Sequence, residues 1–285
     1  MATIWELDYY SRPILDEQQK KLWEVLICES PIEIGDQPES LFRYSQMCPS
    51  STVNSLWLAK AIQEAIAQAP TPPKKIRFFR RQMSNMITKA CSELDIPAVP
   101  SRRTFALHQW LAERMQEVYP SYPGYQPSDN PSVQYVAETP EALPDALVGE
   151  KWAFVTLEAS AFAEMSEWEI EFGEAFSLSA LGLDPQTRIP GVIVYSSRAT
   201  ALSAWMSGLE LAFLKFEAGP PARLILEAGA SDRWLLASFR DAATQTEAKG
   251  FEAAKQKAKH VHFFAVQSNP KSESFAGFWL LQELD

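Results

Sequence analysis

The sequence contains few of the residues from which metal and redox sites are built. It has three cysteines and three histidines among its 285 residues. The cysteines show no Cys-x-x-Cys spacing, which argues against a zinc site and favours reduced thiols over a disulfide framework. His260 and His262 fall on one face of a predicted strand, but no third ligand accompanies them. We therefore expect no metal site.

Glycine is also scarce, with 11 residues, and the glycine-based catalytic motifs are absent. The chain has neither a Gly-x-x-x-x-Gly-Lys phosphate loop nor a Gly-x-Gly-x-x-Gly dinucleotide motif. Ser231 lies in Gly-Ala-Ser-Asp, which differs from the Gly-x-Ser-x-Gly nucleophile elbow. These absences predict a protein that is not an enzyme, has no catalytic residue and binds no cofactor.

Long apolar runs are missing as well. No stretch approaches the roughly 20 apolar residues that a membrane helix requires, so we expect no membrane insertion. Residues 1–5 lead directly into a predicted strand, without the pattern of a signal or transit peptide. We therefore expect a cytoplasmic protein. The hydrophobic content of 46% is sufficient for packed cores and excludes global disorder.

The opening of the chain predicts a β-hairpin formed by residues 5–16 and 22–28. Apolar and aromatic residues alternate with acidic ones in the first arm, which is the pattern of a half-buried strand. Three carboxylates lie on this hairpin, those of Glu6, Asp8 and Glu24. Acidic residues on adjacent strands either hold a metal ion or have a structural or surface role. The residues that surround them distinguish these two interpretations.

The first half of the chain predicts eight elements in the order β-β-β-α-β-α-β-α. This order is that of ribonuclease-H-like folds, and the apolar spacing changes from two to three or four residues wherever a helix is predicted. After the hairpin we expect a strand at 42–47, a helix at 53–68, a strand at 76–79, a helix at 83–94, a strand at 96–99 and a helix at 104–118.

A proline- and tyrosine-rich segment separates the two halves and predicts the domain boundaries. We expect an N-terminal domain at 1–118, a linker at 119–147 and a C-terminal domain at 148–285. The tyrosines of the linker are expected to pack against a neighbouring surface. The fold class is therefore α/β (α+β) with two domains and mixed sheets. In the second half we expect strands at 151–157, 222–228, 233–239, 261–267 and 277–284, and a helix at 247–259.

A nuclease of the ribonuclease-H-like class needs carboxylates that converge on two metal ions. Asp8 on the first strand and Glu64 on the first helix fit that pattern. The fourth strand instead ends in Arg80 and Arg81, whose positive charges would repel the metal ions. The hairpin carboxylates are therefore interpreted as structural or surface groups, paired with Arg12 or with the arginines after the fourth strand.

The charge distribution separates one basic block from an acidic remainder. Between positions 72 and 114 there are nine basic and three acidic residues, a net charge of +6, so the rest of a chain of net charge −10 carries −16. Such a block is typical of a phosphate-binding surface, and a solvated basic face is the alternative.

Two arginine pairs in this block follow neighbouring predicted strands, so we expect them to meet at one edge of the sheet. Arginines grip phosphates or stack on bases, and aromatic neighbours favour single-stranded RNA. At least one of Phe78 and Phe79 must be in the core, because successive strand residues face opposite sides. The candidate RNA-binding residues are Lys74, Lys75, Arg77, Arg80, Arg81, Arg102, Arg103 and Tyr44.

Five stretches in both halves of the chain resemble one known family. Residues 5–16, 74–83, 100–104, 205–211 and 278–281 are similar to the Tab/Atab family of cyanobacteria and chloroplasts. The resemblance implies an RNA-binding protein that supports translation of photosystem reaction-centre messages and the biogenesis of the photosystems. The absence of a transit-peptide pattern implies a cyanobacterial member.

These observations predict a single-stranded RNA partner, with an A/U-rich leader as the expected sequence type. Protein partners from translation or photosystem assembly are also expected. Two alternatives stay open. One is an acidic scaffold that recruits an assembly partner without touching RNA, and the other is a metal-dependent nuclease with a ribonuclease-H-like fold.

Overall fold

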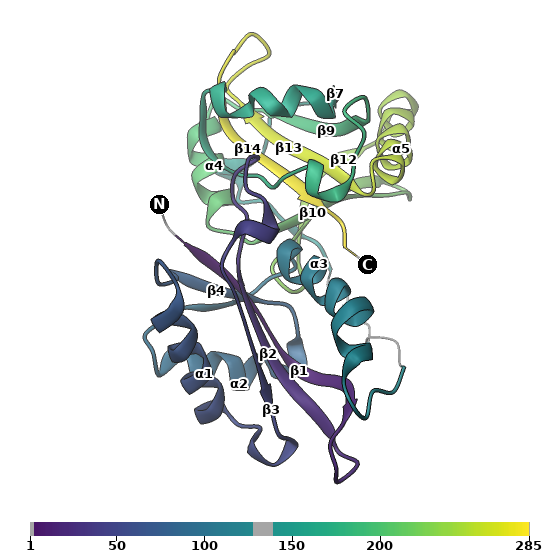
Figure 1. The fold of residues 1–285 in the computed structure, drawn as a ribbon. Helices are drawn as coiled ribbons and strands as arrows, with labels where there is room; N and C mark the ends of the chain where they lie inside the picture. Colours follow the sequence, from purple (N-terminus) through teal and green to yellow (C-terminus); the bar gives the residue numbers. More distant parts are fainter. Residues whose placement is uncertain (1–2, 128–138, 285) are drawn as a thin grey trace. The chain divides into compact units, whose positions relative to one another are not determined.

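The computed structural model describes residues 3–127 and 139–284 and shows two compact units (Figure 1). The first unit comprises Met1–Pro31 and Pro38–Tyr135, and the second comprises Ile32–Gln37 and Val136–Asp285. The short excursion at residues 32–37 belongs to the second unit, where the carbonyl of Ile32 accepts a hydrogen bond from the amide of Ala175 at 2.9 Å. The predicted domain boundaries divide the chain into continuous ranges, so they do not include this excursion.

The first unit is built on a five-stranded sheet in the order β3-β2-β1-β4-β5. The first three strands are antiparallel neighbours, whereas β4 and β5 run parallel to β1. The predicted ribonuclease-H-like order of elements is confirmed. The strands are β1 at Ile4–Leu15, β2 at Lys21–Glu29, β3 at Arg43–Cys48, β4 at Lys75–Phe78 and β5 at Ala98–Pro100.

Helices cover both faces of this sheet (Figure 1). On one face, α1 at Ser55–Gln68 and α2 at Ser84–Ser92 pack on the apolar side chains of β1, which Leu7 represents. On the other face, α3 at Phe105–Glu113 packs on Ile14 and its neighbours. Because strand side chains alternate, the acidic residues between the apolar positions of β1 point toward the α3 side.

The chain after α3 stays attached to the first unit. A π-helical turn at Arg114–Val118 follows the helix, so the predicted helix at 104–118 is two segments with different hydrogen bonding. Tyr119, Tyr122 and Tyr125 then pack on the cluster beneath α3, which confirms the expected packing for these tyrosines. Tyr135 lies outside the described residues.

The second unit contains two mixed sheets. One has five strands in the order β7-β9-β13-β14-β8, and the other has four in the order β10-β11-β12-β6. The strands predicted at 222–228 and 233–239 form an antiparallel pair, and so do the strands predicted at 261–267 and 277–284. The strands are β6 at Glu141–Ala142, β7 at Lys151–Glu158, β8 at Ile170–Glu174, β9 at Arg188–Tyr195, β10 at Leu211–Glu217, β11 at Ala222–Ala228, β12 at Asp232–Phe239, β13 at Val261–Gln267 and β14 at Phe275–Gln282.

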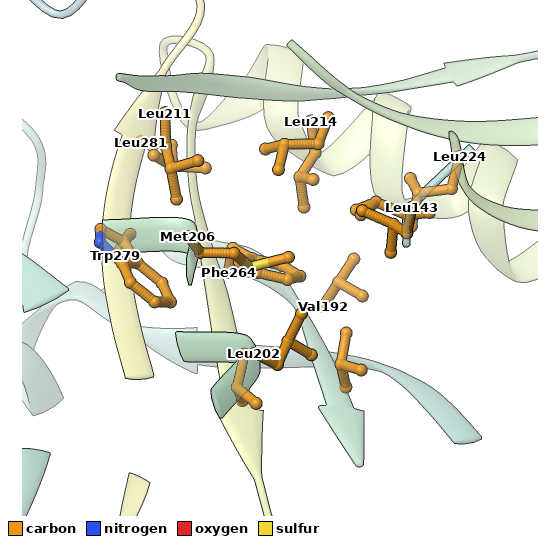
Figure 2. Packing of buried hydrophobic residues seen from close by; sticks show 14 of the residues in the cluster. Leu143, Val192, Leu202, Met206, Leu211, Leu214, Leu224, Phe264, Trp279 and Leu281 are labelled. Carbon is orange, nitrogen blue, oxygen red and sulfur yellow. The ribbon is translucent and has the colours of Figure 1, made fainter. Parts of the chain in front are cut away.

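The core of the second unit lies between the two sheets and the helices that cover them. Figure 2 shows Val192 of β9, Leu214 of β10, Phe264 of β13 and Trp279 of β14 packed together in this core. All four side chains are nearly or fully buried. Complete burial of one such side chain contributes about 1.5–3 kcal/mol, so this cluster is a major source of stability for the second unit.

Two helices, α4 at Ala199–Ser207 and α5 at Ala242–Lys257, belong to the second unit. The prediction placed the start of α5 at residue 247, five residues too late. Asp241 supplies the true start, because its Oδ1 accepts a hydrogen bond from the amide of Thr244 at 2.8 Å. Among the residues that the structure describes, none of the helices combines the length and apolar character needed to span a membrane.

Candidate functional site

The two arginine pairs of the basic block lie at the same edge of the first sheet. Strands β4 and β5 are parallel neighbours, with Phe78 opposite Pro100. Beyond them the amide of Ser101 donates to the carbonyl of Phe78 at 2.9 Å, which keeps the two chain segments together. Arg80 and Arg102 follow directly, so the predicted convergence is confirmed.

Most of these arginines are buried. Arg77 is 1% exposed, Arg80 and Arg103 are each 2% exposed, and Arg102 is 9% exposed. Burial of a charged side chain requires compensation by opposite charge or hydrogen bonds. A buried guanidinium group does not reach an RNA at the protein surface. Direct RNA contact by these four arginines is therefore not supported. Only the exposed residues among the predicted RNA-binding candidates remain available for contact.

Asp8 of β1 compensates two of the buried arginines. Its Oδ1 accepts a hydrogen bond from Nε of Arg80 at 2.6 Å, and its Oδ2 accepts from Nη1 of Arg12 at 2.8 Å. Burial alone raises the pKa of Asp8, but the positive charges of Arg12 and Arg80 outweigh it, so the pKa lies below its ordinary value. Asp8 is therefore ionised at neutral pH and both of its oxygens are occupied.

Glu24 of β2 continues this network across the hairpin. Its Oε2 accepts from Nε of Arg12 at 2.9 Å and from the hydroxyl of Tyr119. Its Oε1 accepts from Nη2 of Arg114 in the π-helical turn. Arg12 thus bridges Asp8 and Glu24, and the network joins β1 and β2 to the segment that follows α3.

Replacement of Tyr119 by phenylalanine is expected to lower the free energy of unfolding by about 1.5–3 kcal/mol. The substitution removes the donor of a buried hydrogen bond to the carboxyl group of Glu24, which also pairs with Arg12, without changing the ring. Tyr122→Phe is the matched control, because Tyr122 is half-buried and its expected change is within about 0.5 kcal/mol. Urea unfolding of the two variants measures the difference, and equal losses would contradict the role given to the Tyr119 hydroxyl.

Glu6 of β1 holds the start of α3. Its Oε2 accepts from the amide of Leu107 at 2.7 Å, and its Oε1 accepts from the hydroxyl of Ser30 at 2.7 Å. The Ser30 hydroxyl also accepts from Nη1 of Arg77 at 3.3 Å. Burial raises the pKa of Glu6 to about 7, despite these hydrogen bonds and the nearby positive charge of Arg77. This carboxyl therefore titrates near neutral pH.

The hairpin carboxylates are structural, and their predicted pairing with Arg12 and the arginine edge is confirmed for Asp8 and Glu24. They are not surface groups, because all three are at most 1% exposed. Glu64 does not converge with Asp8. It accepts from the Tyr44 hydroxyl at 3.2 Å on β3, two strands away from β1. Within the described parts of the chain, no group of three or more His, Cys, Asp or Glu side chains is placed to hold a metal ion.

The remaining candidate residues occupy three separate places. Lys74 is exposed and Lys75 is half-buried at the start of β4, whereas Arg81 is exposed beyond its end. Tyr44 lies on the edge strand β3, three strands from β4, which is about 14 Å at the usual spacing. The residue is 9% exposed, and its hydroxyl lies within hydrogen-bond distance of the side-chain oxygens of Gln46 and Glu64. Tyr44 is therefore not part of the arginine edge.

Comparison with known proteins identifies the family. The profile described as "RNA-binding protein Tab2/Atab2 N terminal" matches residues 4–114, and the profile described as "RNA-binding protein Tab2/Atab2, C-terminal domain" matches residues 130–282. The chain belongs to the Tab2/Atab2 family of RNA-binding proteins. The resemblance seen in the five sequence stretches is thereby confirmed.

Two curated relatives support the membership in the Tab2/Atab2 family. "Protein TAB2 homolog, chloroplastic" of Zea mays is 41% identical over 287 residues, covering 98% of this chain and 71% of the relative. The protein of the same name from Arabidopsis thaliana is 40% identical, covering 98% of this chain and 74% of the relative. The similarity therefore includes both units.

Two half-buried aromatic residues at the arginine edge of this Tab2/Atab2 member were not predicted as site residues. The guanidinium carbon of Arg80 lies 4.2 Å from the centroid of the Tyr10 ring. The centroids of the Tyr10 and Trp23 rings are 5.7 Å apart. Tyr10 follows Asp8 by two residues on the same strand, so both point toward one face of the sheet. This spacing is the sequence signal that could have linked the aromatic pair to the arginines.

Proposed function

We propose that this member of the Tab2/Atab2 family is a non-enzymatic factor that binds single-stranded RNA and supports translation of photosystem reaction-centre messages. The observation that carries the proposal is the match of both family profiles, described as RNA-binding, to 4–114 and 130–282. The two relatives are named as chloroplastic proteins. A cytoplasmic location is supported by three cysteines that are all free and buried, as in proteins of reducing compartments.

We place the RNA on the first unit because of its charge. With 14 basic and 13 acidic residues, the first unit has a net charge of +1, whereas the second unit has 12 basic and 23 acidic residues and a net charge of −11. A polyanion is therefore repelled by the second unit and is tolerated by the first. Arg81 is an exposed cation that directly follows Arg80, and the guanidinium of Arg80 lies over Tyr10, whose ring contacts that of Trp23.

The buried network supports this surface from below. Asp8 fixes the guanidinium of Arg80, and Arg80 lies over the ring of Tyr10, so the edge is held in one arrangement before RNA arrives. Preorganisation of this kind reduces the ordering cost of binding. Exposed cations contact phosphates and aromatic rings stack on bases, which is how single-stranded RNA is bound without a rigid duplex.

Replacement of Arg81 by glutamate is expected to weaken binding of single-stranded RNA by about five- to tenfold. Loss of one phosphate contact should also reduce the slope of log affinity against log salt by about 0.7. Lys89→Glu is the matched control, because Lys89 is an exposed cation on α2 and undergoes the same charge reversal. Fluorescence anisotropy over a salt series measures both effects, and equal losses in the two variants would contradict a contact at Arg81.

A gel-shift experiment with magnesium tests the function itself. The full chain is incubated with a labelled A/U-rich leader RNA at physiological salt, with and without Mg²⁺. We expect a shifted and intact RNA under both conditions. An unshifted RNA would favour the acidic scaffold, and RNA cleaved only with Mg²⁺ and not by Asp8→Asn would favour the nuclease.

A further inference from the structure

The second unit contains an apolar pocket that the proposed RNA surface does not use. Its cavity of about 390 Å³ is lined by side chains that include Ile34, Phe162, Leu178 and Leu183. Phe162 is fully buried and Leu178 is 7% exposed. The volume falls within the range of about 300–1,000 Å³ that is typical of pockets for small ligands, and it is large enough for a single apolar side chain.

One wall of this pocket is polar. Nε2 of Gln37 donates to Oγ of Ser177 at 3.1 Å, and the hydroxyls of Ser177 and Ser179 lie 2.8 Å apart. These groups form a connected row beside the apolar side chains. Gln37 comes from the excursion at residues 32–37, so the pocket combines a segment of the early chain with elements of the second half. The wall can fix the orientation of a bound group that carries an amide.

Acidic residues neighbour the lining of this pocket along the chain. Exposed carboxylates follow or precede three lining residues, with Glu33 next to Ile34, Glu164 next to Ala163 and Asp184 next to Pro185. One cation, Lys259, contacts the chain just before the lining residue Leu183, because its ammonium donates to the carbonyls of Leu181 and Gly182. The whole second unit carries −11, so an anionic ligand is repelled and a cationic one is attracted.

We propose that this pocket binds an apolar side chain of a partner protein whose flanking residues are lysine or arginine. The apolar side chains accept the anchor, and the row of Gln37, Ser177 and Ser179 hydrogen-bonds to the peptide backbone beside it. The acidic residues next to the lining in the sequence, within a unit of net charge −11, attract the flanking cations. RNA is not the proposed occupant, because the net charge of −11 on the second unit repels its phosphates. The chain then binds RNA on one unit and a basic protein segment on the other.

Ala163→Trp tests the pocket, with Ala204→Trp as the matched control. Ala163 is exposed and lines the pocket, so a larger ring there fills the cavity, whereas Ala204 is exposed on α4 and lies outside its lining. The probe is a fluorescein-labelled nine-residue peptide with a central Leu-Phe pair flanked by lysines, and fluorescence polarisation measures its binding to the full chain. A peptide with glutamates in place of the lysines is the charge control.

We expect saturable binding of the lysine-flanked peptide by the wild type and by Ala204→Trp, and a loss of about tenfold or more in Ala163→Trp. The glutamate-flanked peptide should bind at least about tenfold more weakly to the wild type. Absence of saturation at about 1 mM peptide, or equal binding by the two tryptophan variants, would overturn the proposal.

RNA affinity of the same variants separates this proposal from the proposed function. Ala163→Trp should retain wild-type RNA affinity and an unchanged melting temperature. A loss of RNA binding in this variant alone would show that the pocket serves RNA and would overturn the proposal. A wild-type chain that binds the peptide but no RNA would instead contradict the RNA-binding function and leave the pocket assignment supported.

Discussion

Replacement of Asp8 by alanine is expected to lower the free energy of unfolding of the first unit by about 3–5 kcal/mol. The carboxylate neutralises Arg12 and Arg80, which are each 2% exposed, so its removal leaves two guanidinium groups in the interior without their shared partner. The loss of a carboxylate that compensates buried charges is among the few causes of such large losses. Urea unfolding followed by circular dichroism measures the effect.

An exposed ion pair provides the control for this prediction. Lys60 and Glu64 are separated by 3.9 Å on α1, and the side chain of Lys60 is 76% exposed. Lys60→Ala should change the free energy of unfolding by at most about 0.5 kcal/mol, because solvent screens such pairs. Asp8→Asn should fall between the two, since it retains an acceptor oxygen but loses the charge. A loss below about 1 kcal/mol in Asp8→Ala would contradict the structural role of the network.

The stability of the first unit is expected to decrease as the pH rises from about 4.5 to about 7, through the titration of Glu6. Burial raises the pKa of this carboxyl from 4.5 to about 7. Between these values the folded state retains a proton that the unfolded state has released, so the unfolding free energy falls with increasing pH. The difference between the two pKa values corresponds to a loss of about 3 kcal/mol in the free energy of unfolding over this pH range. Above pH 7 the contribution is constant.

Glu6→Gln isolates this contribution. The amide oxygen can still accept from Leu107 at the start of α3, but the side chain no longer titrates. His108 of the first unit, whose pKa is lowered by burial, changes the stability in the opposite direction over a similar range. The measurement is therefore the difference in unfolding free energy between wild type and variant at pH 5 and pH 8. A difference that does not change with pH would contradict the raised pKa of Glu6.

The elements of the first unit could be predicted because each has a local signal. The alternation of apolar and acidic residues predicted the hairpin, and the three- and four-residue spacing of apolar residues predicted the three helices that pack on its sheet. The start of α5 was missed because a single capping interaction, Asp241 with Thr244, decides it in a stretch without a strong apolar pattern. The two-residue strand β6 carries no such pattern at all.

The burial of the arginines could not be predicted from composition. A net charge of +6 between positions 72 and 114 counts residues within one segment, whereas the compensating carboxylates come from the opening hairpin. Asp8 and Arg80 are 72 positions apart in the sequence, and Glu24 and Arg114 are 90 apart. The pairing of β1 with β4 brings Asp8 and Arg80 together, and the turn that follows α3 brings Arg114 to Glu24 on β2. The basic block is thus largely an internal framework, and Arg81 is the member that combines exposure with the arginine edge.

The affinity of the full chain for a single-stranded RNA, measured by fluorescence anisotropy between about 50 and 200 mM salt, tests the central claim most directly. We predict that binding weakens steadily as the salt concentration rises. Arg81→Glu should reduce the slope of log affinity against log salt concentration, and Lys89→Glu should leave it unchanged. No measurable binding at about 50 mM salt, or an affinity that does not depend on salt, would contradict RNA binding by the first unit.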